Sequence, residues 1–91
     1  MQQHARSDLA TLDLLELLTL DDATFKQRFQ GTPMLRTKRR GLLRNVCVAL
    51  GNTADGSALP ALDQASHDNE PLIAEHAQWA IEEIQKRSRE N

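Results

Sequence analysis

The sequence predicts an all-α fold of about five helices, and three observations support this class. Apolar residues recur at spacings of three and four, which is the pattern of the buried face of an amphipathic helix. Sustained alternation of polar and apolar residues, which marks a half-buried strand, is absent, and β-branched residues are sparse. Glycine, proline and short polar clusters divide the apolar segments into stretches of helical length.

Two short helices are expected near the N-terminal end of the chain. The first covers residues 12–18, where leucines provide a wide apolar face. The second covers residues 20–29, with Thr19 as its N-cap. Phe25 and Phe29 are one helical turn apart, so both are expected on the buried side of this helix.

A third helix is expected from Thr32 and Pro33 to about Leu50. Threonine is a good N-cap, and proline is tolerated in the first turn because its missing N–H would have no helical partner there. Gly51 is expected to end the helix, and Gly41 to permit a close approach of another helix. The apolar residues of this segment follow the spacing of a core face: Leu42, Leu43, Val46, Ala49 and Leu50.

Two further helices are expected in the C-terminal half. The fourth covers residues 58–66, with Ser57 as its N-cap. A polar turn that includes Asp68 then leads to a fifth helix over residues 71–86, which begins with a proline. Its expected core face consists of Leu72 or Ile73, together with Ala77, Ala80, Ile81 and Ile84.

The chain length of 91 residues suits one domain or part of a larger one. We expect a flexible N-terminus over residues 1–10, one helical domain over residues 11–87, and a frayed C-terminus over residues 88–91. No apolar run approaches the ~18 residues of a membrane-spanning helix, and the first residues lack the apolar core of a signal peptide. The expected location is therefore the cytoplasm, without membrane contact.

The net charge of −2 conceals an uneven distribution of charged residues. Residues 26–44 contain seven basic residues and no acidic one, whereas residues 45–85 contain seven acidic residues and no lysine or arginine. A concentrated basic block of this kind indicates an anionic partner. Two alternatives stay open, namely that the block packs against the acidic half of the chain or that it forms an ordinary solvated surface.

Within the basic block, the spacing of the arginines indicates a nucleic-acid-binding surface. Arg36, Arg40 and Arg44 follow one another at intervals of four, so on a continuous helix they form one ridge beside the core face. Lys38 and Arg39 lie near the start of that ridge. Guanidinium groups suit phosphate, and no aromatic residue lies between Arg36 and Arg44 for base stacking. These five residues are the predicted RNA-binding set, with contacts to the phosphate backbone.

The third and fifth predicted helices resemble each other at an offset of 31 residues. A period near 30 residues is typical of an α-solenoid, in which stacked repeats share a core. A coincidental alignment of two amphipathic helices is the alternative. With so few repeats, either the first two helices cap the stack or a missing neighbour covers its open end. The aligned positions are Leu42 with Ile73, Val46 with Ala77, and Ala49-Leu50 with Ala80-Ile81.

Three short segments resemble HEAT-like repeats of the kind found in relatives of phycobilisome lyases. They are ALGN at residues 49–52, ALPAL at residues 58–62 and AQWAI at residues 77–81. This resemblance implies an α-solenoid of HEAT-like helices. It implies no chemistry, because such repeats serve many partners.

A longer stretch resembles the C-terminal region of epoxyqueuosine reductases. The matching elements are Phe25, Phe29, GTP at residues 31–33, RxKR at residues 36–39, LRN at residues 43–45, ALGN at residues 49–52 and EHAxWA at residues 75–80. This family completes queuosine at the wobble position of certain tRNAs. The resemblance implies a parent enzyme with cobalamin and two 4Fe-4S clusters, in which this region helps to hold the substrate tRNA. The cysteine runs that hold those clusters are not in this chain, so no cofactor and no catalytic residue is expected here.

The residues themselves offer little support for a separate active site. The lone Cys47 excludes a disulfide framework and a cysteine-rich metal site within the chain. His67 and His76 have acidic neighbours, but a surface turn and a packing role are the simpler interpretations. Trp79 is interpreted as an anchor in the core or between repeats, with a binding role as the alternative. No metal site is predicted.

The sequence therefore predicts a tRNA-substrate-binding domain that is not catalytic by itself. Its partners would be tRNA and the missing catalytic domain of the parent oxidoreductase. The alternative is a HEAT-like scaffold for protein–protein interaction, and an autonomous enzyme is the third and least supported class.

Overall fold

The computed structural model describes residues 13–90, and every regular element in that range is helical. The all-α prediction is confirmed for this part of the chain, whereas the expected flexible N-terminus lies outside it. Residues 13–18 are helical and are followed by α2 (Asp22–Phe29), α3 (Met34–Thr53), the short 3₁₀ turn η1 (Gly56–Ala58), α4 (Leu59–Ala65) and α5 (Pro71–Glu90).

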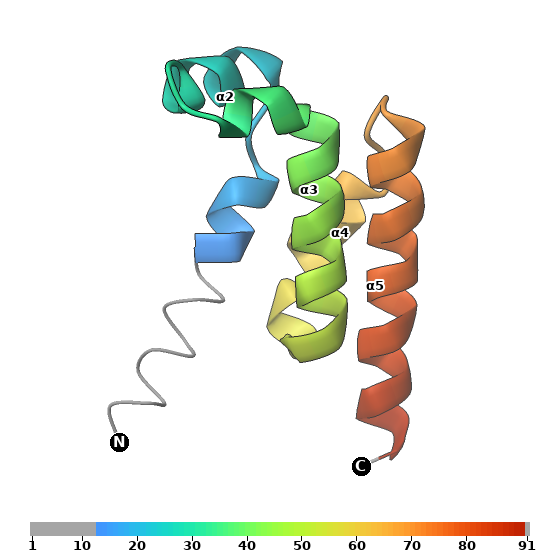
Figure 1. The fold of residues 1–91 in the computed structure, drawn as a ribbon. Coiled ribbons are helices and arrows are strands. Elements are labelled where there is room, and N and C mark those ends of the chain that lie inside the picture. The colour runs from blue at the N-terminus through green and yellow to red at the C-terminus, as the bar shows by residue number, and fades with distance from the viewer. Residues whose placement is uncertain (1–12, 91) are drawn as a thin grey trace, which may run out of the picture.

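The helices lie in a simple arrangement around α3 (Figure 1). Helices α3 and α5 lie side by side and run in the same direction, and among α2 to α5 they make the most extensive contact. Helix α4 lies behind them and returns the chain to the end at which α5 begins. Helix α2 lies beside the start of α3, so that end of the molecule brings together α2, the first turns of α3 and the α4–α5 turn.

The N-cap of α2 differs from the predicted one. Asp21 is the cap: its carboxylate accepts a hydrogen bond of 2.8 Å from the backbone N–H of Thr24. The Thr24 hydroxyl in turn accepts a bond of 2.9 Å from the backbone N–H of Asp21, which completes a capping box. The hydroxyl of Thr19, the expected cap, donates to the carbonyl oxygen of Glu16 instead, at the end of the preceding helical segment.

Two other expected caps are also wrong. The Thr32 hydroxyl donates to the carbonyl oxygen of Phe29, and Pro33 occupies the N-cap position of α3 without a side-chain hydrogen bond. Ser57 lies inside the 3₁₀ turn, where its backbone N–H donates to the carboxylate of Asp55 at 2.9 Å. In each case a neighbouring residue takes the capping position because the helix starts one or two residues away from its expected start.

The buried apolar residues form one core that draws on all the described helices. The two phenylalanines of α2 pack with their ring centroids 5.1 Å apart, and Phe25 is the buried one. On α5, Ile73 and not Leu72 is buried, which resolves the predicted alternative. The predicted core face of α3 is confirmed except at Ala49, which is half-buried; its buried members are Leu42, Leu43, Val46 and Leu50.

Gly51 does not end α3 as predicted but lies inside it, at the contact with α5. A Cβ atom there would lie 2.5 Å from the Trp79 ring and 3.1 Å from the Cα of Ala80. The glycine therefore permits the close approach that was expected of Gly41, where a Cβ would meet only the Thr37 side chain, at 3.0 Å. Tertiary packing overrides the local preference of glycine for a helix end at this position.

The pattern of buried residues in α3 recurs in α5 best at a spacing of 30 residues. At the predicted spacing of 31, two of the predicted alignments also join buried residues, namely Leu42 with Ile73 and Val46 with Ala77. Because the two helices run in the same direction, residues that correspond in this way face the same interior. The best-buried correspondences are Leu43 with Ile73, Cys47 with Ala77, and Leu50 with Ala80, all of them without exposed surface.

Candidate nucleic-acid interface

Helix α3 is interrupted at Lys38, within the predicted RNA-binding set. The backbone of Lys38 has φ 65° and ψ 158°, so α3 consists of a short first part and a longer second part on either side of a kink. This backbone conformation is costly for a residue with a Cβ, by about 1–3 kcal/mol. Arg36 lies before the kink, whereas Arg40 and Arg44 lie after it. The prediction of one continuous arginine ridge is therefore wrong, because the helix on which it depends is broken.

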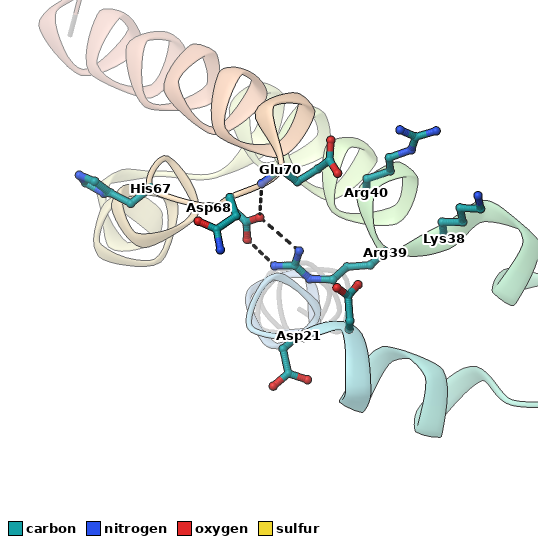
Figure 2. A pocket seen from close by; sticks show the side chains of 9 residues that line it. Asp21, Lys38, Arg39, Arg40, His67, Asp68 and Glu70 are labelled. Carbon is teal, nitrogen blue, oxygen red and sulfur yellow. Dashed lines mark hydrogen bonds and ion pairs between the residues drawn. The ribbon is translucent and has the colours of Figure 1, made fainter.

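Arg39, directly after the kink, is held by two polar contacts. Its Nε donates a hydrogen bond of 2.7 Å to the carbonyl oxygen of Leu20, in the segment before α2. Its guanidinium group forms a two-bond ion pair with the carboxylate of Asp68, in the turn between α4 and α5 (Figure 2). Both side chains of the pair are only 16% exposed. Arg39 thus joins three segments that are far apart in the sequence.

Asp68 is itself fixed in place by the start of α5. Its carboxylate accepts a hydrogen bond of 2.9 Å from the backbone N–H of Glu70, which is an Asx turn. The hydrogen bond from Arg39 lowers the pKa of Asp68, with a further contribution from the Glu70 N–H, whereas partial burial opposes the shift. The same hydrogen bond raises the pKa of Arg39. Both groups are therefore charged at neutral pH.

A polar cleft of about 680 Å³ surrounds this ion pair. Figure 2 shows Arg39 extending toward Asp68, whereas Lys38 and Arg40, which line the same cleft, point away from that carboxylate. The sequence predicts Asp68 in the turn before the fifth helix, and the structure confirms this position. The sequence shows no sign of the contact between Asp68 and Arg39. The cleft is lined by residues of both charges: Asp21, Asp22, Lys38, Arg39, Arg40, His67, Asp68, Asn69 and Glu70.

The five predicted RNA-binding residues occupy three different environments. Arg36, Lys38 and Arg40 are exposed, and no carboxylate in the described part of the chain lies within ion-pairing distance of them. Arg39 is engaged by Asp68 and Leu20. Arg44 is half-buried, and its Nε atom is enclosed without a hydrogen-bond partner. We call the exposed group of Arg36, Lys38 and Arg40 the cationic surface.

Internal neutralisation, the alternative interpretation of the basic block, applies to a part of it. Besides Arg39, Arg28 pairs with Glu16 at 3.3 Å, and its guanidinium lies 5.9 Å from the centre of the Phe29 ring. The pair is exposed to solvent on both sides, so its contribution to stability is small. The cationic surface is not neutralised in this way by any described residue.

The other candidate side chains make local contacts. His67 and His76 each hydrogen-bond through Nδ1 to a backbone carbonyl oxygen four residues earlier, at 2.8 Å. Cys47 is fully buried, and this burial raises the pKa of its thiol to about 11. Across residues 13–90, no three histidine, cysteine or acidic side chains are grouped as metal ligands would be.

Trp79 is an anchor at the α3–α5 contact with one side open to solvent. Its ring lies over Gly51 and is 37% exposed. A shallow depression of about 440 Å³ beside it is lined by Val48, Asn52, Glu75 and His76. None of the helices described is long and apolar enough to cross a bilayer.

Comparison with known proteins gives a consistent result. The chain is 42% identical over 79 residues to an epoxyqueuosine reductase of Xanthomonas campestris, with 85% of this chain and 22% of the relative covered. It is 37% identical over 84 residues to an epoxyqueuosine reductase of Salmonella typhimurium, with coverages of 91% and 22%. The chain is homologous to one segment of these enzymes. It spans about 22% of their length. A relative in Escherichia coli with the same name is 34% identical over 85 residues.

No family model matches the chain, and no solved structure matches it. The named relatives nevertheless confirm the resemblance to epoxyqueuosine reductases that the sequence motifs indicate, for the homologous segment.

Proposed function

We propose that this chain is the C-terminal, tRNA-binding part of an epoxyqueuosine reductase, and that it is not catalytic by itself. Its helices would form HEAT-like pairs, with α3 and α5 in one layer and α4 in the other. Two findings support the proposal. The similarity to epoxyqueuosine reductases covers most of the chain, and the structure exposes a cationic surface whose three residues form no ion pair with any carboxylate among residues 13–90. The second of these, the cationic surface, carries the proposal.

The cationic surface would contact the phosphate backbone of tRNA and not its bases. Lysine and arginine neutralise phosphates, and such contacts position a nucleic acid without reading its sequence. Base stacking needs an exposed aromatic ring near the cations. Phe25 is buried, and Phe29 is half-buried and packs on the Phe25 ring. Neither Phe29 nor Trp79 lines the cleft at Lys38 and Arg40. In this proposal, the chain holds the tRNA while the catalytic domain of the parent enzyme modifies it in the cytoplasm.

The parent enzyme would use cobalamin and two 4Fe-4S clusters, but the residues of this chain do not fit a cluster site. A 4Fe-4S cluster is held by four cysteine thiolates. The chain contains one cysteine, Cys47, which is fully buried and has a raised pKa. We therefore assign no redox step to this chain.

A titration of labelled tRNA at several salt concentrations tests the proposal. If the cationic surface neutralises three phosphates, log K plotted against log salt has a slope of about −2 to −3. The double variant Arg36→Glu/Arg40→Glu should remove most of this binding. Lys86→Glu/Arg89→Glu is the matched control. It makes the same charge change at exposed positions near the C-terminal end of α5, away from the cationic surface. Equal losses in the two double variants would contradict a localised tRNA surface.

A scaffold for protein–protein interaction is the second candidate. The exposed side of Trp79, beside an apolar depression, is the observation that favours it. This function predicts no affinity for tRNA even at low salt. Absence of binding by the wild-type chain would therefore favour the scaffold over the tRNA-binding function.

A further inference from the structure

The side chain of Arg39 takes a different direction from those of its two neighbours. Lys38 and Arg40 are exposed, whereas Arg39 turns inward and is only 16% exposed. All three residues line the same cleft. Arg39 uses its Nε for the Leu20 carbonyl and both Nη atoms for Asp68, so its donors are directed to protein partners and away from solvent.

The strained backbone at Lys38 needs a structural cause. A residue with a Cβ keeps a positive φ of this kind only where the surrounding structure enforces it. The next residue, Arg39, is attached on one side to the segment before α2 and on the other to the turn before α5. These two attachments fix the position of the chain immediately after the kink.

Asp68 supplies a rigid end for this attachment. Its carboxylate accepts the N–H of Glu70 as well as the hydrogen bonds from Arg39, so it is tied to the start of α5. Helix α5 packs along α3 through fully buried residues such as Ile73 and Ala77. The packed core thereby fixes the direction in which Lys38 and Arg40 project.

We propose that Arg39 and Asp68 are a positioning pair for the cationic surface: together they hold the kink of α3 so that Lys38 and Arg40 present their charges to the tRNA backbone, while Arg39 itself does not contact the RNA. The inference rests on the proposed tRNA-binding function and assigns separate roles within it. Lys38 and Arg40 bind phosphate, and the pair behind them sets their geometry.

Opposite effects on binding separate this role from simple electrostatics. The Asp68 carboxylate is a negative charge in a cleft beside cations, so its removal should strengthen anion binding if only charge mattered. It should also strengthen binding if Arg39, once released, contacted phosphate directly. If the pair positions the surface, its removal weakens binding, because Lys38 and Arg40 lose their fixed arrangement.

The deciding experiment compares Asp68→Asn with Glu70→Gln in the full 91-residue chain. Each variant removes one negative charge from the same cleft, but only the first breaks the ion pair; the Glu70 backbone N–H that binds Asp68 is untouched. Labelled tRNA is titrated at several salt concentrations, below the unfolding transition, with circular dichroism as the check of the fold. We expect Asp68→Asn to bind at least about threefold more weakly, with a salt slope shallower by about 1, as for one lost phosphate contact. Glu70→Gln should bind as tightly as the wild type or more tightly.

Each other outcome has a definite meaning. Tighter binding by Asp68→Asn would overturn the positioning role while leaving the tRNA-binding function intact. A lowered melting temperature with unchanged affinity and slope would also overturn it, because the pair would then be only stabilising. If the wild-type chain does not bind tRNA at low salt, the proposed function fails and the positioning role fails with it.

A second variant covers the case in which Asp68→Asn does not fold. Arg39→Lys keeps the net charge and leaves Asp68 a cationic partner, but it removes the planar fork that bonds Asp68 and Leu20 together. Weaker tRNA binding with a shallower salt slope supports the positioning role. Unchanged affinity and slope would overturn it.

Discussion

The two ends of α3 are held by different kinds of contact. At the N-terminal end, beside a strained kink, Arg39 bonds a carboxylate and a carbonyl group from two other segments. At the C-terminal end, Leu50 is fully buried and Gly51 lies against Trp79 and Ala80 of α5. Arg87 of α5 also binds that end of α3. Its guanidinium donates hydrogen bonds to the carbonyl oxygens of Gly51, at 2.6 Å, and Ala54.

This difference separates stability from geometry. Full burial of a leucine contributes about 1.5–3 kcal/mol, whereas the attraction within a partly buried ion pair is largely offset by loss of hydration. Apolar burial at the C-terminal end therefore stabilises the fold more than the ion pair at the N-terminal end does. The N-terminal end provides direction, because the two-bond pair of Arg39 with Asp68 has a defined geometry that apolar contacts lack.

The largest expected effect comes from removing apolar volume at the C-terminal end. Leu50→Ala should lower the free energy of unfolding by about 2–5 kcal/mol, because Leu50 is fully buried and the cavity cannot collapse completely. The matched variant Leu35→Ala lies before the kink of the same helix, where the side chain is 39% exposed, and should cost about 0.5 kcal/mol. Urea denaturation followed by circular dichroism measures both. Similar losses would contradict the proposed division between the two ends.

The next effect concerns the two glycines of α3. Gly51→Ala should destabilise the protein by about 1–3 kcal/mol, because the added Cβ meets Trp79 and the backbone of Ala80. Gly41→Ala makes the same substitution where only the side chain of Thr37 must move, and should stabilise the helix by up to about 1 kcal/mol. Thermal unfolding of the two variants should therefore shift in opposite directions. A shift in the same direction would show that close approach is not what requires Gly51.

A smaller effect, of the opposite sign, is expected at the kink. Lys38→Gly removes the Cβ that makes a φ of 65° unfavourable. After allowance for the greater freedom of glycine in the unfolded chain, the free energy of unfolding should rise by about 1 kcal/mol. Chemical denaturation measures the change. A loss of stability would indicate that Lys38 has a helical backbone in solution and that the strain is absent.

The smallest effect is a change in the pH dependence of stability. The folded-state pKa of Asp68 is lowered, so the ion pair stabilises the protein above the unfolded-state pKa of about 4 and this contribution is lost as the pH falls through the folded-state value. The wild type should therefore lose more stability than Asp68→Asn on going from neutral to strongly acidic pH. Denaturation series at several pH values test this. Parallel curves would mean that the pair contributes nothing to folding.

Much of the fold could be predicted because helical periodicity is a local property. Phe25, Leu43 and Ile84 were all placed on buried faces from their spacing alone, and the structure confirms them. The caps were less predictable: Thr19 and Asp21 are both good capping residues, and only the packed position of α2 selects between them. Gly51 shows the same limit, since a glycine suits a helix end and a close helix contact equally well.

The candidate site was predictable in composition but not in arrangement. The basic residues around Lys38 are visible as a block in the sequence, and their charge indicates an anionic partner. Arg39 and Asp68, however, are 29 residues apart, and no local pattern shows that they form a pair. Nor does any local signal show that α3 breaks at Lys38, because lysine and its neighbours are ordinary helix residues.

The sequence by itself therefore determined the helical class, most of the core and the concentration of positive charge, because each follows from the spacing and chemistry of neighbouring residues. Only the tertiary structure decided which cations remain available to a partner. That selection depends on where distant carboxylates and carbonyl groups come to lie when α2, α3 and the α4–α5 turn meet: Arg39 is taken up there by Leu20 and Asp68, and Arg36, Lys38 and Arg40 remain on the surface.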